Sequence, residues 1–174
     1  MLDRKLWRIE TRTWGKILAV LVLIMSAFWL VRLNHSRFSP DTKFTTITGE
    51  TFTLKALQSK PVLITFWATS CGICLKEIPD LVELYQQFHP QGLEIIAIAM
   101  AYDPPNRVVA LTRERNLPYP VVLDLASEYV KAFGPIWGTP TSILIDKKGA
   151  ISNRKIGTFE LTDMQSRIQQ LLEG

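Results

Sequence analysis

The chain has 174 residues, enough for one domain of ordinary size and a short additional segment. Its apolar fraction of 47% and charged fraction of 21% are those of a globular protein and exclude a largely disordered chain. The net charge of +4 comes from residues 1–35, which contain six basic and two acidic side chains, whereas the remaining 139 residues contain 14 of each. The body of the protein therefore has no basic excess, and no nucleic-acid partner is expected.

The first predicted element is an apolar run of fifteen residues, Ile17–Val31, which follows a basic leader at residues 1–16. As a helix the run would span roughly 22 Å, short of the ~30 Å hydrocarbon core, but Lys16 and Arg32 can extend their charged ends toward the headgroups. A core helix at a chain terminus would not be apolar on all sides. A cleaved signal peptide fits the leader, but residues 32–38 offer no pair of small residues for cleavage.

These features favour an uncleaved signal-anchor rather than a cleaved signal peptide. The anchor would be a single transmembrane helix at residues 17–33. A polar tether would follow at residues 34–43. The basic residues before the apolar run outnumber those just after it, so the N-terminus should stay in the cytoplasm. In a bacterium, the rest of the chain would then lie in the periplasm on the outer side of the inner membrane, an oxidising compartment.

The remainder of the chain alternates between strand and helix patterns. The continuous apolar run at residues 62–67 is typical of a central buried strand, and apolar residues recur at helical spacing from Ile73 to Phe88. Residues 102–106 are interpreted only as a loop leading into a helix. This alternation predicts an α/β domain with a mixed sheet. The predicted strands cover residues 44–47, 51–54, 62–67, 93–100, 121–123, 141–146 and 150–156, and the later helices cover 107–116, 125–133 and 161–172.

The only two cysteines, Cys71 and Cys74, stand between the buried strand at residues 62–67 and the helix that follows. A helix N-terminus presents unpaired N–H groups and the positive end of the helix dipole, which stabilise a thiolate. Cys71 is at this end and is expected to be the nucleophile. Cys74, about one turn further along, is expected to be less exposed and to resolve a mixed disulfide formed on Cys71.

Two other interpretations of the cysteine pair are weaker. A structural zinc site needs four ligands, and the chain offers only His35 and His89 besides the cysteines. A purely structural disulfide across so short a loop would restrict the unfolded chain very little. The preferred interpretation is redox activity that needs no metal and no cofactor other than the Cys71–Cys74 disulfide.

The stretch Phe66-Trp67-Ala68-Thr69-Ser70-Cys71-Gly72-Ile73-Cys74 resembles the active site of the thioredoxin superfamily. Pro79 stands where that family carries its helix proline, and Gly138-Thr139-Pro140 resembles its cis-proline loop. The run at residues 74–79, with the N-terminal apolar segment, resembles the membrane-anchored branch that contains the TlpA, ResA and cytochrome c maturation thioredoxins.

The resemblance extends over roughly residues 44–172. It implies a thioredoxin-like domain at residues 44–174, with a three-layer fold around a central mixed sheet. An extra strand and helix, typical of the branch, are expected within residues 95–133.

The resemblance also implies roles for individual residues. Thr65 stands where thioredoxin has a buried Asp, and the anchored branch instead carries a Glu that matches Glu77. Glu77 lies three residues after Cys74, so a helix makes them neighbours. Spacing alone favours a solvated carboxylate at Glu77, but the resemblance favours a catalytic role in handling the proton of Cys74.

Four residues are expected to bind the substrate. A cis bond before Pro140 would turn the backbone of Thr139 toward the cysteines, where it can pair with an extended substrate segment. Trp67 is expected to support the site, and Trp137 is expected to line the substrate groove.

The resulting functional hypothesis is a membrane-anchored periplasmic thiol–disulfide oxidoreductase that reduces protein disulfides. The resemblance implies apocytochrome c as a candidate substrate and a membrane thiol–disulfide protein as the electron donor. A disulfide oxidase or isomerase remains an alternative, because the two residues between the cysteines do not reveal the direction. A copper-handling protein and a peroxidase are weaker, since no His follows His89 and the motif around the cysteines differs from that of a peroxidase.

Overall fold

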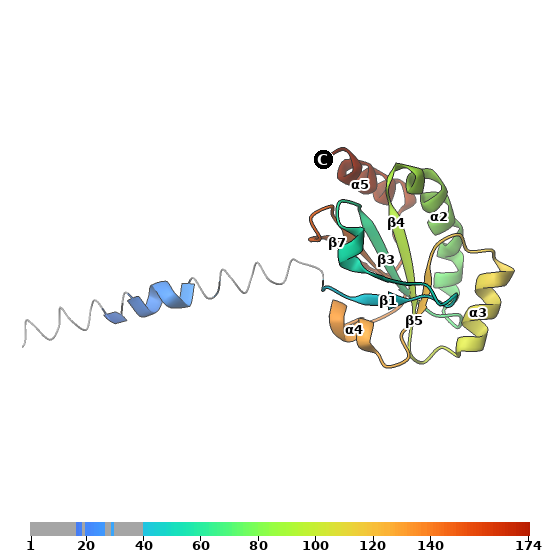
Figure 1. Ribbon diagram of the computed structural model, residues 1–174, viewed down its shortest axis with the longest axis horizontal. Helices are drawn as coiled ribbons and strands as arrows, with labels where there is room; N and C mark the ends of the chain where they lie inside the picture. The colour runs from blue at the N-terminus through green and yellow to red at the C-terminus, as the bar shows by residue number, and fades with distance from the viewer. Residues whose placement is uncertain (1–16, 19, 27–28, 30–39) are drawn as a thin grey trace, which may run out of the picture. The chain divides into compact units, whose positions relative to one another are not determined.

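The computed structural model describes residues 17–18, 20–26, 29 and 40–174 (Figure 1). The chain divides into two units, Met1–Phe38 and Ser39–Gly174. The described residues of the first unit are helical. Within the described ranges, no helix has the length and hydropathy needed to cross a bilayer. The leader at 1–16, the rest of the predicted anchor and the tether as far as residue 39 lie outside the described residues.

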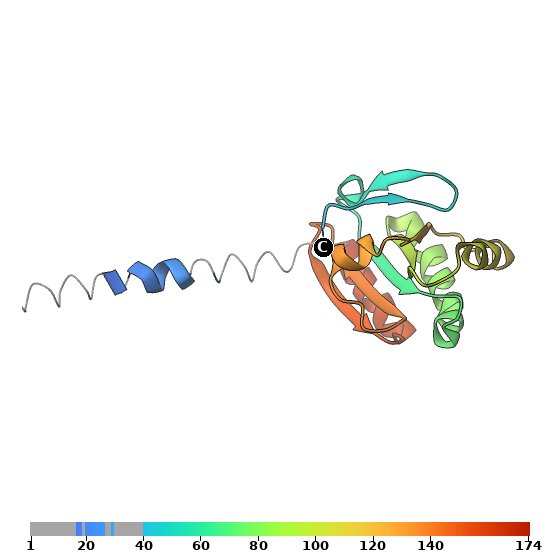
Figure 2. The same cartoon turned by 90° about the horizontal axis from the view of Figure 1, so that it is seen from below.

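A five-stranded mixed sheet in the order β5-β4-β3-β6-β7 forms the centre of the second unit. β3 is central, pairing parallel with β4 and antiparallel with β6, and all six of its side chains are buried. A short antiparallel hairpin, β1–β2, lies beside the sheet, at the top of Figure 2. The strands are β1 Lys43–Thr45, β2 Thr51–Thr53, β3 Val62–Trp67, β4 Glu94–Ala99, β5 Val121–Leu123, β6 Thr141–Ile145 and β7 Ile151–Ile156.

Successive side chains of β3 enter two different cores because neighbouring residues of a strand point to opposite faces. Leu63 packs with buried side chains of α2, α3 and α5, whereas Ile64 packs with the hairpin and α4. The unit is therefore a three-layer α/β domain, as the sequence predicted. The helices are η1 Leu54–Leu57, α2 Gly72–Phe88, η2 His89–Gln91, α3 Pro105–Glu114, α4 Glu128–Phe133 and α5 Leu161–Glu173.

One helix is shorter than its sequence pattern predicted. The apolar pattern at residues 125–133 predicted a helix over the whole stretch, but α4 begins only at Glu128. The buried carboxylate of Asp124 accepts hydrogen bonds from the backbone N–H groups of Tyr129 and Val130, both at 3.0 Å. Since these donors already have a partner, Leu125 remains in the loop before the helix.

The strand ends beside the cysteines all lie at one end of the sheet. The register pairs Trp67 with Ala99 and Ala99 with Leu123, so β3, β4 and β5 finish level with one another. Thr141, the first residue of β6, pairs with Phe66 of β3 and with Ile156, the last residue of β7. Loops that are far apart in the sequence therefore meet here, and we call this side of the sheet its cysteine end.

Candidate active site

Cys71 and Cys74 form a disulfide at the start of α2, with their Cα atoms 5.2 Å apart. Cys71 is the N-cap residue of the helix, and its Sγ accepts a hydrogen bond from the backbone N–H of Cys74 at 3.2 Å. Cys71 is half-buried, whereas Cys74 is only 2% exposed. A partner can therefore approach the sulfur that the helix end favours as a thiolate, while the second sulfur stays behind it.

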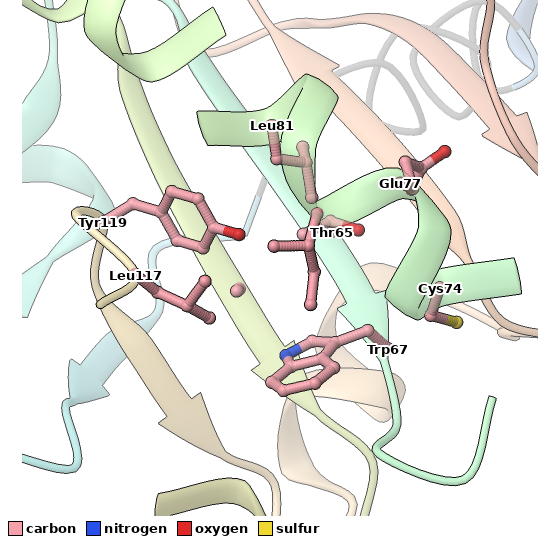
Figure 3. A pocket seen from close by; sticks show the side chains of 9 residues that line it. Thr65, Trp67, Cys74, Glu77, Leu81, Leu117 and Tyr119 are labelled. Carbon is pink, nitrogen blue, oxygen red and sulfur yellow. The ribbon is translucent and has the colours of Figure 1, made fainter. Parts of the chain in front are cut away.

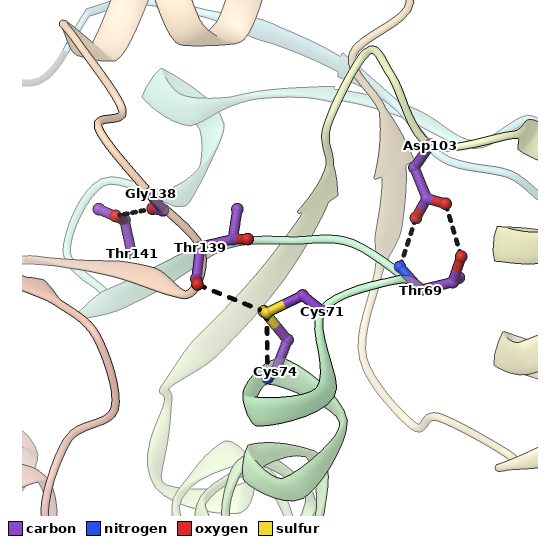
Figure 4. Close-up of a disulfide and its surroundings, with 7 residues drawn as sticks. All are labelled: Thr69, Cys71, Cys74, Asp103, Gly138, Thr139 and Thr141. Atoms are coloured by element: carbon purple, nitrogen blue, oxygen red, sulfur yellow. Dashed lines mark hydrogen bonds between the residues drawn. A yellow bond between two sulfur atoms is a disulfide. The ribbon is translucent and has the colours of Figure 1, made fainter.

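The loop before β6 lies against Cys71 (Figure 4). The Thr139–Pro140 peptide bond is cis, which confirms the prediction from the sequence. The carbonyl oxygen of Thr139 is 3.4 Å from the Sγ of Cys71. A disulfide sulfur carries no hydrogen, so this is a contact in the oxidised protein, and it becomes a possible S–H···O hydrogen bond after reduction. The hydroxyl of Thr141 donates to the carbonyl oxygen of Gly138 at 2.6 Å and closes the loop.

Glu77 is buried one helical turn beyond Cys74, with 3% of its surface exposed. Its Oε1 accepts a hydrogen bond from the backbone N–H of Phe159 at 3.2 Å. Burial raises the pKa of the carboxyl from 4.5 to about 7; the hydrogen bond from Phe159 lowers it in part, and the charge of Asp80 raises it slightly further. The alternative of a solvated carboxylate is therefore wrong. A group with this pKa can take up and release a proton near neutral pH.

Figure 3 shows Cys74 and Glu77 on successive turns of α2, with the sulfur and the carboxyl on the same side of the helix. Tyr119 and Leu117 lie on the other side. Between them is a small cavity of about 10 Å³, roughly the space that one water molecule needs. Burial, with a smaller contribution from the charge of Glu77, raises the pKa of Tyr119 above its usual value, so its hydroxyl stays protonated. The environment behind Cys74 is thus largely apolar and only sparsely hydrated.

The two tryptophans of the predicted site have different environments. Trp67 is 4% exposed, lines the small cavity, and its Nε1 has no hydrogen-bond partner within the described part of the chain. It therefore supports the cysteines from the core and offers almost no surface to a substrate, which corrects its assignment as a substrate-binding residue. Trp137 is 81% exposed and precedes the Gly138–Thr139 loop. This position is compatible with its predicted place in a substrate groove.

Asp103, predicted only as part of a loop leading into a helix, is a further residue of the site. This side chain is 2% exposed and binds the turn just before the cysteines (Figure 4). Its Oδ2 accepts from the backbone N–H of Thr69 at 2.6 Å and its Oδ1 accepts from the Thr69 hydroxyl at 2.5 Å. The sequence did contain a signal: parallel neighbouring strands bring their following loops together, and Asp103 follows β4 as Thr69 follows β3.

Comparison with known proteins gives one consistent result. Residues 34–172 match the Redoxin family model. The thiol-disulfide oxidoreductase ResA of Bacillus cereus is 32% identical over 142 residues, which cover 80% of each chain. ResA of Geobacillus thermodenitrificans is 29% identical over 133 residues, covering 76% of this chain and 75% of the relative.

Solved structures similar to this chain include thiol–disulfide proteins of the thioredoxin family. The crystal structure of a thioredoxin-family thiol:disulfide interchange protein from Chlorobium tepidum superposes with a TM-score of 0.72 and 28% identity, covering 78% of this chain and 96% of that one. StoA of Bacillus subtilis superposes with a TM-score of 0.62 and 25% identity, covering 72% and 93%.

The fold, the Cys71–Cys74 pair at a helix N-terminus and the cis-proline loop beside it agree with these matches. The match covers most of the chain and most of each relative. The chain belongs to the Redoxin family and is a thiol–disulfide oxidoreductase of the ResA type within the thioredoxin superfamily.

Proposed function

We propose that this protein is a membrane-anchored reductase of protein disulfides. The thiolate of Cys71 attacks one sulfur of the partner's disulfide, forming a mixed disulfide and releasing the partner's other sulfur as a thiolate. Cys74 then attacks the sulfur of Cys71, which frees the second partner thiol and closes the Cys71–Cys74 disulfide. Two electrons pass to the partner. The observation that carries this scheme is the placement of an accessible Cys71 at the helix N-terminus with Cys74 buried behind it.

In this scheme Glu77 takes the proton from the thiol of Cys74 as that sulfur becomes a nucleophile. Burial holds the carboxyl near a pKa of about 7, so it is available as a base at neutral pH. A buried base suits a buried thiol, because bulk water cannot readily remove the proton at this position. Glu77 is thus assigned to the resolving step, while the helix end activates Cys71.

The electrostatics of the site favour reduction as the physiological direction. A strongly oxidising pair owes its potential to stabilisation of the reduced form, in which one sulfur is a thiolate. Among the described residues, no hydrogen bond or ion pair joins a basic side chain to Cys71, Cys74 or Glu77. Instead the carbonyl oxygen of Thr139 faces Cys71, and Glu77 places a carboxyl near Cys74. Both features oppose an additional negative charge and offset part of the stabilisation that the helix end gives to the Cys71 thiolate, which keeps the pair from being strongly oxidising.

The cellular setting of the proposal comes from the sequence. The apolar run at residues 17–31 behind a basic leader supports a single span with the N-terminus in the cytoplasm of a bacterium and the catalytic domain in the periplasm. A reductase in that compartment needs repeated reduction, which supports a membrane thiol–disulfide protein as electron donor. Apocytochrome c is a candidate substrate because its cysteines must be reduced before haem attachment.

A redox titration of the full chain tests the direction. A midpoint at or below about −270 mV, the range of thioredoxin, is expected for a reductase. A midpoint near −120 mV, the value of a strong oxidant, would overturn the proposed direction in favour of the oxidase alternative. For the anchor, the chain should stay with the membrane fraction in alkaline carbonate, and its catalytic domain should be digested by protease added from the periplasmic side.

A further inference from the structure

The large apolar side chains that are exposed in residues 40–174 all lie at one end of the sheet. Every one of them lies within six residues of a strand end at the cysteine end defined above, and the remainder of this described range exposes no other. They belong to five different loops and elements: the first turn of α2, the loops after β4 and β5, the loop before β6, and the end of β7. These residues are Ile73, Tyr102, Leu125, Trp137 and Ile156.

The strand order places these residues in a sequence across the domain. Reading from β5 to β7 gives Leu125, Tyr102, Ile73, Trp137 and Ile156, one for each strand position, with Ile73 in the middle beside the cysteines. Neighbouring strands lie about 4.8 Å apart, so the row of strand ends is about 19 Å long. An extended polypeptide advances about 3.3 Å per residue, so about six residues would cover this length.

The two loops on the β4 and β5 side are held firmly although they expose apolar side chains. Tyr102 precedes Asp103, whose buried carboxylate binds Thr69 in the turn before Cys71. Leu125 follows Asp124, whose buried carboxylate binds the first N–H groups of α4. Each exposed side chain is therefore adjacent to a buried aspartate that fixes its loop. Exposed apolar groups gathered on one side of a well-ordered domain are typical of sites that bind a partner.

We propose that Tyr102 and Leu125 form a second arm of the substrate-docking surface, on the opposite side of Cys71 from Trp137. The occupant is an extended polypeptide segment that carries the disulfide cysteine and has apolar side chains beside it. This inference rests on the proposed function. The sulfur of Cys71 lies between the two arms, so a polypeptide segment that contacts both arms must place its disulfide at Cys71. A small disulfide would reach Cys71 without touching Leu125, because the loop that carries Leu125 follows β5, which is two strand spacings, about 10 Å, from β3.

The experiment compares three substrates for the full chain in its reduced form. Two are peptides of about eight residues with one cysteine in mixed disulfide with glutathione, flanked by leucine and phenylalanine in one peptide and by serine in the other. The third is the small aromatic disulfide DTNB. The variants are Tyr102→Ser and Leu125→Ser, with Ala101→Ser and Ala126→Ser as controls at exposed neighbouring positions in the same loops.

The unmodified protein should prefer the apolar peptide. Each variant should lower kcat/KM for that peptide by about tenfold, as expected for loss of one apolar contact, and leave the rates with DTNB and the serine peptide unchanged. The two controls should behave like the unmodified protein. Equal rates of the variants and the unmodified protein on the apolar peptide would overturn the inference, as would a parallel loss on DTNB, which would mean that the cysteines themselves were perturbed.

Other occupants of this surface give different results. If the unmodified chain dimerises in sedimentation experiments and Tyr102→Ser abolishes the dimer, the partner is a second copy and the inference fails. If Tyr102→Ser instead abolishes binding of the catalytic domain to phosphatidylglycerol vesicles, the partner is lipid and the inference also fails. Should the unmodified protein reduce none of the three disulfides, the proposed function fails, and the docking surface for a disulfide substrate fails with it.

Discussion

Replacing Glu77 by glutamine should make the stability of the protein less dependent on pH. The carboxyl has a pKa of about 7 in the folded protein and 4.5 in the unfolded chain. Between these values the folded state binds the extra proton, so the free energy of unfolding falls as pH rises from 4.5 to 7 and levels off above 7. At about 1.4 kcal/mol per pKa unit, the total loss over the 2.5 units is about 3.5 kcal/mol.

Glutamine has a similar shape and its carbonyl oxygen can still accept the hydrogen bond from Phe159, but it cannot ionise. Urea unfolding of the oxidised protein at pH 5 and pH 8 should therefore show Glu77→Gln gaining about 2.5 kcal/mol relative to the parent chain between the two conditions, since part of the loss has already occurred by pH 5. Using the oxidised form removes titration of the cysteines. Glu83→Gln, at an exposed position on the same helix, is the matched control and should show no such gain. An equal stability difference between Glu77→Gln and the parent at both pH values would refute the reasoning.

Four further predictions concern the chemistry. The rate of the resolving step in the parent chain should rise with pH through about 7, and Glu77→Gln should remove that component; an unchanged pH profile would eliminate Glu77 as the base. Cys74→Ser should accumulate a mixed disulfide with a peptide substrate, detectable by mass spectrometry, whereas Cys71→Ser should accumulate none. Iodoacetamide should alkylate Cys71 in the Cys74→Ser chain with an apparent pKa below the ~8.5 of free cysteine, and an ordinary thiol value would contradict activation by the helix end. Asp103→Ala should lower the free energy of unfolding by about 2–4 kcal/mol and shift the apparent pKa for alkylation of Cys71. Asp103→Asn should recover much of the stability and much of that pKa. If Asp103 has only a structural role, the alkylation profile of Cys71 will not change.

Much of the architecture was accessible from the sequence because it depends on neighbouring residues. The continuous apolar run of β3 is typical of a strand buried on both faces, and its predicted bounds match the structure. The position of Cys71 at the start of α2, with Cys74 one turn later, follows from helix geometry alone. The cis bond before Pro140 was predicted from a resemblance, since nothing in the composition of that loop distinguishes cis from trans.

The remaining properties of the site depend on segments that are far apart in the chain. Spacing on a helix makes Glu77 look solvated; its burial, and with it the raised pKa, requires the segment at Phe159, 82 residues later. The contact between Asp103 and Thr69, 34 residues apart, exists only because β3 and β4 pair in parallel and end level. The apolar periodicity predicted a helix that begins at Leu125. The helix begins instead at Glu128, because Asp124, which is outside the periodic pattern, binds the N–H groups of its first turn.

Local sequence therefore determined the elements of this protein and the place of its reactive sulfur. The raised pKa of the Glu77 carboxyl and the order of exposed side chains around Cys71 were decided by the tertiary structure. The physical reason is that backbone conformation and side-chain periodicity are set by near neighbours along the chain. Desolvation and surface exposure instead depend on which distant segments cover a side chain, and only the folded sheet determines that.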